Sequence, residues 1–437
     1  MVKIGLQIKF QECYNTNKGL VCMKRTIFCI DLKSFYASCE CLLINKDPLK
    51  TPLVVASKTQ GPGAITLAVT PYLKNLGIKS RGRIYEIPSH LKYIHIHPKM
   101  SYYVEKSKEV INVFLDFVNQ KDLHVYSVDE SFLDVTNYLK YYNLNDEELA
   151  SKILKTIKEK TGLLAVCGIG SNLFIAKTAM DIDAKHSSNN IANWTDAEAK
   201  IKIKKIKKLT DMWGIGKNMA KRLTSIQIFS IKDLAESDPE YLNSKLGIIG
   251  LELWNHANGI DEAIISDDEY YSKNISYANS QILFKDYNKD NIKIIIEETI
   301  NLLAKRLRQN NKSCKKLSLG IGYSYDVNQS FYKSITFDNY TRDKKVLYEY
   351  ALFLLKKNIE DYPIRKLSIS LGTIKSINKR QLNLFEENNS TKKEYKIDKK
   401  IDEIQNKYGK NAILSASSLL LDSTIINRNG KLGGHSA

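Results

Sequence analysis

Three acidic side chains have the types and the spacing that metal-dependent chemistry requires. Asp31 ends the apolar run TIFCID, and Asp129 with Glu130 falls between LHVYSV and SFLDV, where the alternating pattern predicts the bend of a β-hairpin. Carboxylate oxygens are the ligands that Mg²⁺ prefers, and a Mg²⁺ site leaves positions for water and substrate phosphates. Two such ions could lower the pKa of an attacking hydroxyl and neutralise the charge on a leaving pyrophosphate, as nucleotidyl transfer needs. Taken singly, each acid is more often a surface residue or a helix cap.

The segments around these acids predict a palm-like α+β arrangement. Residues 26–31 predict a buried strand, and Ser34 is placed to cap the helix that follows it. Residues 101–118 predict a helix that faces the core through one apolar stripe, made of Tyr103, Val110, Ile111, Phe114, Leu115 and Val118. With the hairpin, the order becomes strand, helix, hairpin, helix and strand.

The length and charge of the chain indicate several domains and a polyanionic partner. A chain of 437 residues is long enough for two to four domains at roughly 100 to 200 residues each. Lysine and arginine outnumber aspartate and glutamate by 66 to 48, which gives a net charge of +18 and a pI near 9.3. This balance favours a partner such as nucleic acid, although a solvated basic surface explains the composition equally well.

Cysteine usage and hydropathy predict a cytoplasmic protein without a membrane partner. The seven cysteines include no CxxC pair, so neither a disulfide framework nor a zinc site is indicated. No stretch approaches the ~20 apolar residues of a membrane span, and the first residues lack the apolar region of a signal peptide. Met23 directly precedes the first predicted strand, so residues 1–22 could be an extension.

Two downstream segments suggest further domains. Lysines crowd residues 199–224, which predicts a small helical domain. After a polar linker at 263–273, residues 273–378 show a β-α-β-β-α-β pattern with 19 basic and 10 acidic side chains, a net +9. In its strand KLSLGIGYSY, apolar residues alternate with small ones such as Ser318 and Gly320. The bare face could admit a phosphate backbone or mark a close packing site, and this strand alone favours neither.

The two acidic motifs resemble those of a known enzyme family. IDLKSFYASCE and YSVDESFLDVT are similar to the metal-binding motifs of Y-family translesion DNA polymerases, and FYASCE resembles the UmuC-like branch of ImpB/MucB/SamB type, as in Gram-positive bacteria. The similarity continues through LAVTPYLKNLGIKS, CGIGSNLFIAKTAMDIDAK and WGIGKNMAKRL, in the family's order. It therefore covers nearly the whole chain from Met23.

The resemblance implies an α+β multidomain fold, the right-hand polymerase. Its parts would be a ferredoxin-like palm, small fingers, a helical thumb with a helix-hairpin-helix, and a β-α-β-β-α-β little-finger domain. The expected boundaries are an extension at 1–23, the palm at 24–34 and 101–192, the fingers at 35–100, the thumb at 193–262, a linker at 263–273, the little finger at 274–378 and a tail at 379–437.

The resemblance also assigns the site residues. Asp31, Asp129 and Glu130 would be catalytic and would bind two Mg²⁺ ions, with the Leu32 carbonyl as a further ligand and Mn²⁺ as an alternative ion. Tyr36 would be a steric gate against the 2′-hydroxyl of a ribonucleotide; without the resemblance it would count as a core aromatic.

The incoming nucleotide would meet the start of the same helix. Backbone N–H groups of Ser34, Phe35 and Tyr36 would hold its triphosphate, as helix N-termini commonly do. Lys74 and Lys185 match positions where the family places triphosphate-contacting cations. Lys74 would otherwise be interpreted as a surface lysine.

Two segments would contact DNA. The WGIG run at 213–216 lies between basic segments and predicts a helix-hairpin-helix, whose glycines let backbone N–H groups meet a DNA phosphate closely. The expected contacts are Trp213, Gly214, Ile215, Gly216 and Lys217, with Ser318 and Gly320 of the little finger.

A pentapeptide after the last predicted strand resembles the peptide by which bacterial polymerases bind the sliding clamp. Gln381, Leu382, Leu384 and Phe385 are therefore expected to bind the beta subunit of the clamp. The remaining tail predicts one helix and a short extended segment. The UmuC-like resemblance also raises a RecA- or UmuD-like activator as a partner.

The implied function is low-fidelity translesion synthesis in DNA repair and the SOS response. The enzyme would be a DNA-directed DNA polymerase that adds dNTPs to a primer opposite damaged template. A non-catalytic DNA-binding adaptor at stalled forks, held by the clamp, is the alternative from another class. Nucleotide cyclisation would leave the thumb, the little finger and the clamp peptide unexplained.

Overall fold

Two compact units make up the chain. The computed structural model describes residues 13–16, 19–22, 25–265, 275–324, 326–327, 329–376, 388–432 and 435–436. One unit comprises Met1–Tyr270 with His435–Ala437, and the other comprises Tyr271–Gly434. Across those described ranges, no helix has both the length and the apolarity needed to cross a membrane.

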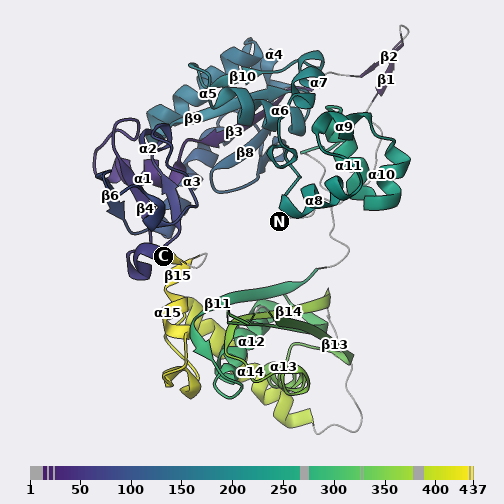
Figure 1. The fold of residues 1–437 in the computed structure, drawn as a ribbon. Helices are drawn as coiled ribbons and strands as arrows, with labels where there is room; N and C mark the ends of the chain where they lie inside the picture. Colours follow the sequence, from purple (N-terminus) through teal and green to yellow (C-terminus); the bar gives the residue numbers. More distant parts are fainter. Residues whose placement is uncertain are drawn as a thin grey trace. The chain divides into compact units, whose positions relative to one another are not determined.

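A five-stranded sheet forms the centre of the first unit (Figure 1). In spatial order its strands are β10 (Ile191–Asn193), β9 (Ala165–Gly170), β3 (Ile27–Leu32), β8 (Glu130–Asp134) and β7 (Leu123–Val125). β9 pairs parallel with β10, and the other neighbours pair antiparallel. The helices that accompany this sheet are α3 (Met100–Leu115), α4 (Tyr138–Tyr142), α5 (Asp146–Thr161) and α6 (Leu173–Ala179).

Alternation along β3 decides which helix each of its side chains meets. Phe28 and Ile30 belong to the core cluster that contains α3 and α5, whereas Ile27 and Cys29 belong to the cluster that contains α6. Because successive side chains of a strand point to opposite faces, Asp31 lies on the face that α6 covers.

The apolar stripe predicted for α3 is correct except at its end. Tyr103, Val110 and Phe114 are buried, but Leu115 is 41% exposed, so its assignment to the core was wrong. The helix ends at this residue, and Val113 is buried instead.

Two glycines of β9 allow α6 to lie directly against the sheet. A Cβ at Gly168 would lie 2.1 Å from the Ala176 carbonyl oxygen, and one at Gly170 would lie 2.5 Å from Cγ2 of Ile175. Any larger residue would push the helix away, so these positions fix its height above the strands. After α6 the chain continues as a π-helical turn, Met180–Ala184.

A small three-stranded sheet and a helical cluster complete the first unit. The small sheet has the order β5 (Thr66–Val69), β4 (Leu53–Ala56), β6 (Ile94–Ile96) and is accompanied by α1 (Phe35–Leu43), α2 (Pro71–Asn75) and 3₁₀ turns at Lys58–Gly63 and Ile84–Glu86. The cluster contains α7 (Asp196–Lys204), α8 (Lys217–Ser225), α9 (Ile231–Glu236), α10 (Pro239–Leu246) and α11 (Ile248–Ala257). Shorter elements are β1 (Cys13–Thr16), β2 (Gly19–Cys22) and 3₁₀ turns at Gln120–Asp122 and Leu209–Asp211.

The second unit has the element order β-α-β-β-α-β, as the sequence pattern predicts. Its elements are β11 (Tyr277–Tyr287), α12 (Ile292–Gln309), β12 (Lys312–Tyr323), β13 (Ser330–Thr341), α13 (Lys344–Asn358) and β14 (Ile364–Ser376). The strands form one antiparallel sheet in the order β11-β14-β12-β13. Apolar side chains of β12 and β14 share a core with α12 and α13, so one face of the sheet is covered by helices.

The C-terminal segment packs onto α12 and α13. It contains α14 (Asn388–Tyr408), a 3₁₀ turn at Ala416–Leu419, α15 (Ile425–Asn429) and the short strand β15 (Lys431–Leu432), whereas β16 (His435–Ser436) is assigned to the first unit. Arg308 of α12 donates to Asp402 at 2.7 Å and to Asp398 at 3.3 Å, both on α14. The buried carboxylate of Glu298 accepts hydrogen bonds from Ser423 and Thr424.

Candidate active site

The three acids of the sequence motifs meet where β3 and β8 lie side by side. Asp31 pairs in register with Glu130, and the Leu32 amide donates to the Asp129 carbonyl at 2.9 Å. Asp31 and Glu130 both lie on the sheet face that α6 covers, together with Cys29 and Phe132. The sheet thus brings together residues that are about one hundred positions apart in the chain.

Two lysines and a fourth acid continue this cluster along α6 and the π-helical turn. Lys177 contacts Glu130 at 2.8 Å and Asp181 at 3.1 Å. Lys185 contacts Asp181 at 2.7 Å and Asp31 at 2.9 Å. The result is a row of alternating charges, Glu130–Lys177–Asp181–Lys185–Asp31, which we call the charge row. Sequence reasoning singled out Lys185 but missed Lys177 and Asp181, although their spacing of four residues was a usable signal.

Burial and mutual repulsion shift the titration of this cluster. Burial raises the pKa of the Asp31 carboxyl, the charges of Asp129 and Glu130 raise it further, and Lys185 opposes them. Burial lowers the pKa of Lys185, but the charges of Asp31 and Asp181 outweigh that effect and leave the pKa raised. A site in which carboxylates crowd together out of water favours the binding of cations.

Lys74 lies within electrostatic reach of the same carboxylates. Partial burial lowers its pKa, the charges of Asp31 and Asp129 act in the opposite direction, and Lys185 adds to the lowering. Lys74 lies in the last turn of α2, so the cluster is within electrostatic reach of a cation from a second element.

The acids differ in how freely they could bind a metal ion. Asp129 accepts a hydrogen bond from the Ser127 hydroxyl at 2.6 Å, through one oxygen. Glu130 has both oxygens occupied, by Lys177 at 2.8 and 2.9 Å and by the Cys29 thiol at 3.3 Å. Within the described part of the chain, no three Asp, Glu, His or Cys side chains are already arranged as a metal site. Among the described contacts, Asp31 and Asp129 each have one oxygen engaged, Asp31 by Lys185 at 2.9 Å, whereas Glu130 would have to share both of its oxygens with Lys177.

Tyr36 stands beside this acidic cluster between two aromatic rings. Its ring stacks on Tyr103 at 4.6 Å between centroids and lies 5.5 Å from Phe35. Burial raises the pKa of Tyr36, and the charge of Asp129 raises it further, so the phenol lies within electrostatic reach of this acid.

The start of α1 differs from the prediction in one respect. Ser34 has φ 50° and its side chain makes no cap hydrogen bond, so the expected capping role was wrong. Its carbonyl accepts from the Ser38 amide at 2.9 Å. The residue that precedes α1 therefore has a left-handed backbone conformation, and its hydroxyl does not cap the helix.

The WGIG segment forms a tight turn ahead of α8. Gly214 has φ 94°, a conformation that favours glycine, and Gly216 precedes the first residue of the helix, Lys217. Ile215 is buried in the core, and Trp213 stacks with Phe174 at 6.3 Å. The two hydrophobic residues anchor the turn, whereas both glycines and Lys217 are exposed.

Ser318 and Gly320 lie in the middle of the second unit's sheet, and both are buried. Gly320 is paired with Tyr332, whose Cδ2 would lie 2.8 Å from a Cβ at that glycine. The sequence left two interpretations of the strand face that carries small residues, approach of a phosphate backbone and close packing. At Gly320 the structure shows close packing. A ring from the neighbouring strand covers it.

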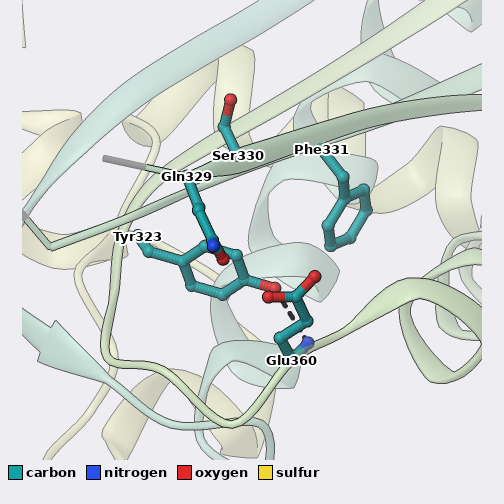
Figure 2. Close-up of a pocket in the computed structure, with 5 residues that line it drawn as sticks. All are labelled: Tyr323, Gln329, Ser330, Phe331 and Glu360. Atoms are coloured by element: carbon teal, nitrogen blue, oxygen red, sulfur yellow. Dashed lines mark hydrogen bonds between the residues drawn. The ribbon is translucent and has the colours of Figure 1, made fainter. Parts of the chain in front are cut away.

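A hollow of about 340 Å³ opens elsewhere on the second unit, between Tyr323, Gln329, Ser330, Phe331 and Glu360 (Figure 2). The Tyr323 hydroxyl accepts from the Glu360 amide at 2.8 Å. Its lining includes a single carboxylate and no basic side chain, so it lacks the groups that phosphate chemistry needs. The clamp-type residues Gln381, Leu382, Leu384 and Phe385 lie outside the described residues.

Comparisons with known proteins agree with this architecture. The profile of the impB/mucB/samB family matches residues 30–181, and that of its C-terminal domain matches residues 275–384. The chain is 36% identical over 415 residues to the UV-damage repair protein UvrX of Bacillus subtilis, covering 94% of this chain and 98% of the relative. It is 28% identical over 416 residues to DNA polymerase IV 2 of the same organism, covering 94% and 99%. A chimeric Y-family DNA polymerase built from Dbh and Dpo4 shares the fold with a TM-score of 0.63 and 22% identity, over 80% of this chain and 99% of that one.

The fold and the clustered carboxylates together define a nucleic-acid polymerase of the right-hand class. The predicted α+β fold is confirmed by the likeness to the Y-family structure. More particularly, the chain belongs to the impB/mucB/samB family and is a UmuC-like Y-family DNA polymerase.

Proposed function

We propose that this enzyme carries out template-directed, low-fidelity translesion synthesis, adding dNTPs to a primer 3′ end by two-metal nucleotidyl transfer. The observation that carries the proposal is the meeting of Asp31 and Asp129 at neighbouring strands beside Lys185 and Lys74. Such a pairing of carboxylates with lysines fits a nucleotide whose triphosphate is bound together with divalent ions.

We assign the domain roles as the family resemblance implies them. The five-stranded sheet would be the palm, the small sheet the fingers and the cluster α7 to α11 the thumb. The second unit would be the little finger, whose segment 273–378 carries a net charge of +9. Exposed Gly214, Gly216 and Lys217 would hold a DNA phosphate, and such contacts depend on salt rather than on sequence.

Asp31 and Asp129 would hold two Mg²⁺ ions, or Mn²⁺, with Glu130 and the Leu32 carbonyl as further ligands. When bound, the ions supply activation of the primer hydroxyl and neutralisation of the leaving pyrophosphate. The protein's own side chains and amides would orient the nucleotide. Lys185 and Lys74 attract the triphosphate, and the α1 amides of Ser34, Phe35 and Tyr36 would bind it at the helix start.

Tyr36 would select the sugar. Its ring is held by Tyr103 on one side and Phe35 on the other, so it cannot swing away easily from a 2′-hydroxyl. The same stacking would limit the movement of the ring against which the nucleotide is proposed to bind. We propose that the enzyme acts in DNA repair and the SOS response in the cytoplasm, with the sliding clamp and a RecA- or UmuD-like activator as partners.

Primer extension tests the proposal. Wild type and Asp129→Asn would be compared with dNTPs and Mg²⁺ on intact and lesion-bearing templates. We expect extension past the lesion by the wild type and none by the variant, since the variant loses a carboxylate charge. Inactivity of both with tight, salt-sensitive DNA binding would favour the adaptor, and the same mixture with an added activator would separate that outcome from a missing partner.

A further inference from the structure

We propose that Asp181 is a positioning residue, which holds Lys177 and Lys185 in place so that Lys185 can bind the triphosphate of an incoming dNTP. This inference rests on the proposed function, because it concerns the same nucleotide. It deepens that function by adding a residue that is not itself expected to bind a metal ion or the substrate.

Asp181 is the central member of the charge row. Its two oxygens face different lysines, with Oδ1 at 2.7 Å from the Lys185 ammonium and Oδ2 at 3.1 Å from that of Lys177. Each lysine also contacts a carboxylate of the acidic cluster, Lys185 at Asp31 and Lys177 at Glu130. Asp181 therefore joins two cations that would otherwise repel each other.

The other partners of the lysines cannot perform this task once divalent ions are bound. Under the proposed function, Asp31 and Glu130 would direct oxygens to metal ions, and their hold on the lysines would weaken. Asp181 lies outside that ligand set, so its contacts persist. It would keep Lys185 at the edge of the cluster, where the triphosphate arrives.

The backbone gives Asp181 a fixed location. Gly168 and Gly170 let α6 rest directly on β9, and the π-helical turn begins immediately after this helix. The Lys185 amide donates to the Met180 carbonyl at 3.2 Å, the five-residue step of a π-helix. Such turns occur often at functional sites. Here the turn supports both the acid and the lysine that it positions.

A carboxylate near a triphosphate could also repel it. Two ammonium groups within 3.1 Å of Asp181 largely cancel its field at a distance, so loss of orientation should outweigh loss of repulsion. The two effects have opposite signs, and nucleotide affinity therefore distinguishes them.

The same turn offers a matched control. Asp183 stands two residues further along and accepts from the Trp194 indole at 2.8 Å and from Lys202 at 2.7 Å, on the side of β10 and α7. Asp183→Asn removes the same charge from the same turn without touching Lys177 or Lys185. This variant therefore measures how removal of one carboxylate charge from the π-helical turn affects nucleotide binding in general.

The experiment is single-turnover insertion of one dNTP, which separates its apparent dissociation constant from the maximal rate. Asp181→Asn should raise the dissociation constant about 3- to 10-fold, less than the loss of a direct charge-assisted contact because Lys185 itself remains, and leave the maximal rate within about 2-fold. In a Lys185→Ala background the same change should add less than about 2-fold, because the positioned group is gone. Asp183→Asn should leave the dissociation constant unchanged.

Three results would overturn the inference: a dissociation constant that is unchanged or lower in Asp181→Asn, an undiminished effect without Lys185, or an equal effect of Asp183→Asn. These are distinct from failure of the proposed function itself. That failure would show as a wild type without templated extension, or as an Asp129→Asn variant that still extends, and it would remove the basis of this inference too.

Discussion

Replacing Glu298 by Ala should release the C-terminal segment from α12. The carboxylate is 5% exposed and accepts from the Ser423 hydroxyl at 2.6 Å, from the Thr424 amide at 3.1 Å and hydroxyl at 3.0 Å, and from the Ile425 amide at 3.3 Å. Thr424 is also 5% exposed, so its amide and hydroxyl could not replace the lost hydrogen bonds with bonds to water. Hydrogen bonds to a charged acceptor contribute about 1.5–3 kcal/mol each, and the two donors of the buried Thr424, counted alone at the lower value, give an expected loss of about 3 kcal/mol.

Hydrogen exchange measured by mass spectrometry on the full chain tests this magnitude locally. A loss of about 3 kcal/mol corresponds to roughly 100-fold faster exchange of the amides in residues 420–429, when opening and closing are rapid. Glu297→Ala is the control, because Glu297 lies on the same helix and no hydrogen bond joins it to residues 423–425 in the described structure. Exchange within about 3-fold of the wild type in Glu298→Ala would refute the assignment of this carboxylate as the anchor.

Further predictions concern pH, sugar selection and the clamp. Burial lowers the pKa of His256, so the folded state binds the proton less readily than the unfolded state, in which the histidine titrates near 6.5. The contribution of His256 to the free energy of unfolding should therefore be complete above about pH 6.5 and should decrease as the pH falls below that value. Urea unfolding of wild type and His256→Phe at pH 8 and pH 5.5 checks this, and an equal fall in both would contradict it. Tyr36→Ala should raise ribonucleotide insertion on the order of 10- to 100-fold, and unchanged sugar discrimination in single-nucleotide kinetics would remove the gate assignment. Replacing Leu384 and Phe385 by Ala should abolish stimulation by the sliding clamp and spare basal extension, and persistent clamp binding in a pull-down would refute the docking role.

The central part of the site was accessible from the sequence because it depends on short-range patterns. Strand alternation and the hairpin bend placed Asp31, Asp129 and Glu130, and the family resemblance, confirmed by the comparisons, supplied their partners. The roles of these residues remain predictions. Lys74, which without the resemblance would count as a surface lysine, lies within electrostatic reach of the acids.

Features that depend on a neighbouring element could not be derived. The strand of Gly320 shows alternation but not the identity of the cross-strand residue, Tyr332, that covers it. The four-residue spacings of Lys177, Asp181 and Lys185 could indicate their pairing, but not the contacts of these lysines with Glu130 and Asp31 on neighbouring strands. The anchoring of Thr424 by Glu298 joins positions 126 apart, where neither segment has periodicity that indicates the other. Leu115 was misplaced although it lies within the helix, because the buried face there runs through Val113 and Phe114 and leaves Leu115 on the exposed side.

The docking of the C-terminal segment sets an order of events during synthesis. Lys285 and Tyr287 of β11 contact Asp422 at 2.6 and 2.8 Å. These contacts of the first strand of the second unit can form only after a residue more than one hundred positions further along the chain has been synthesised. The first unit needs none of these residues for its sheet, and it can fold while the rest is still being translated. A chain interrupted before Asp422 would thus contain the acidic cluster of the first unit, and its second unit would lack the hydrogen-bond donors of Glu298. The contacts of β11 with Asp422 therefore form only after the four strands of the second unit's antiparallel sheet have been synthesised.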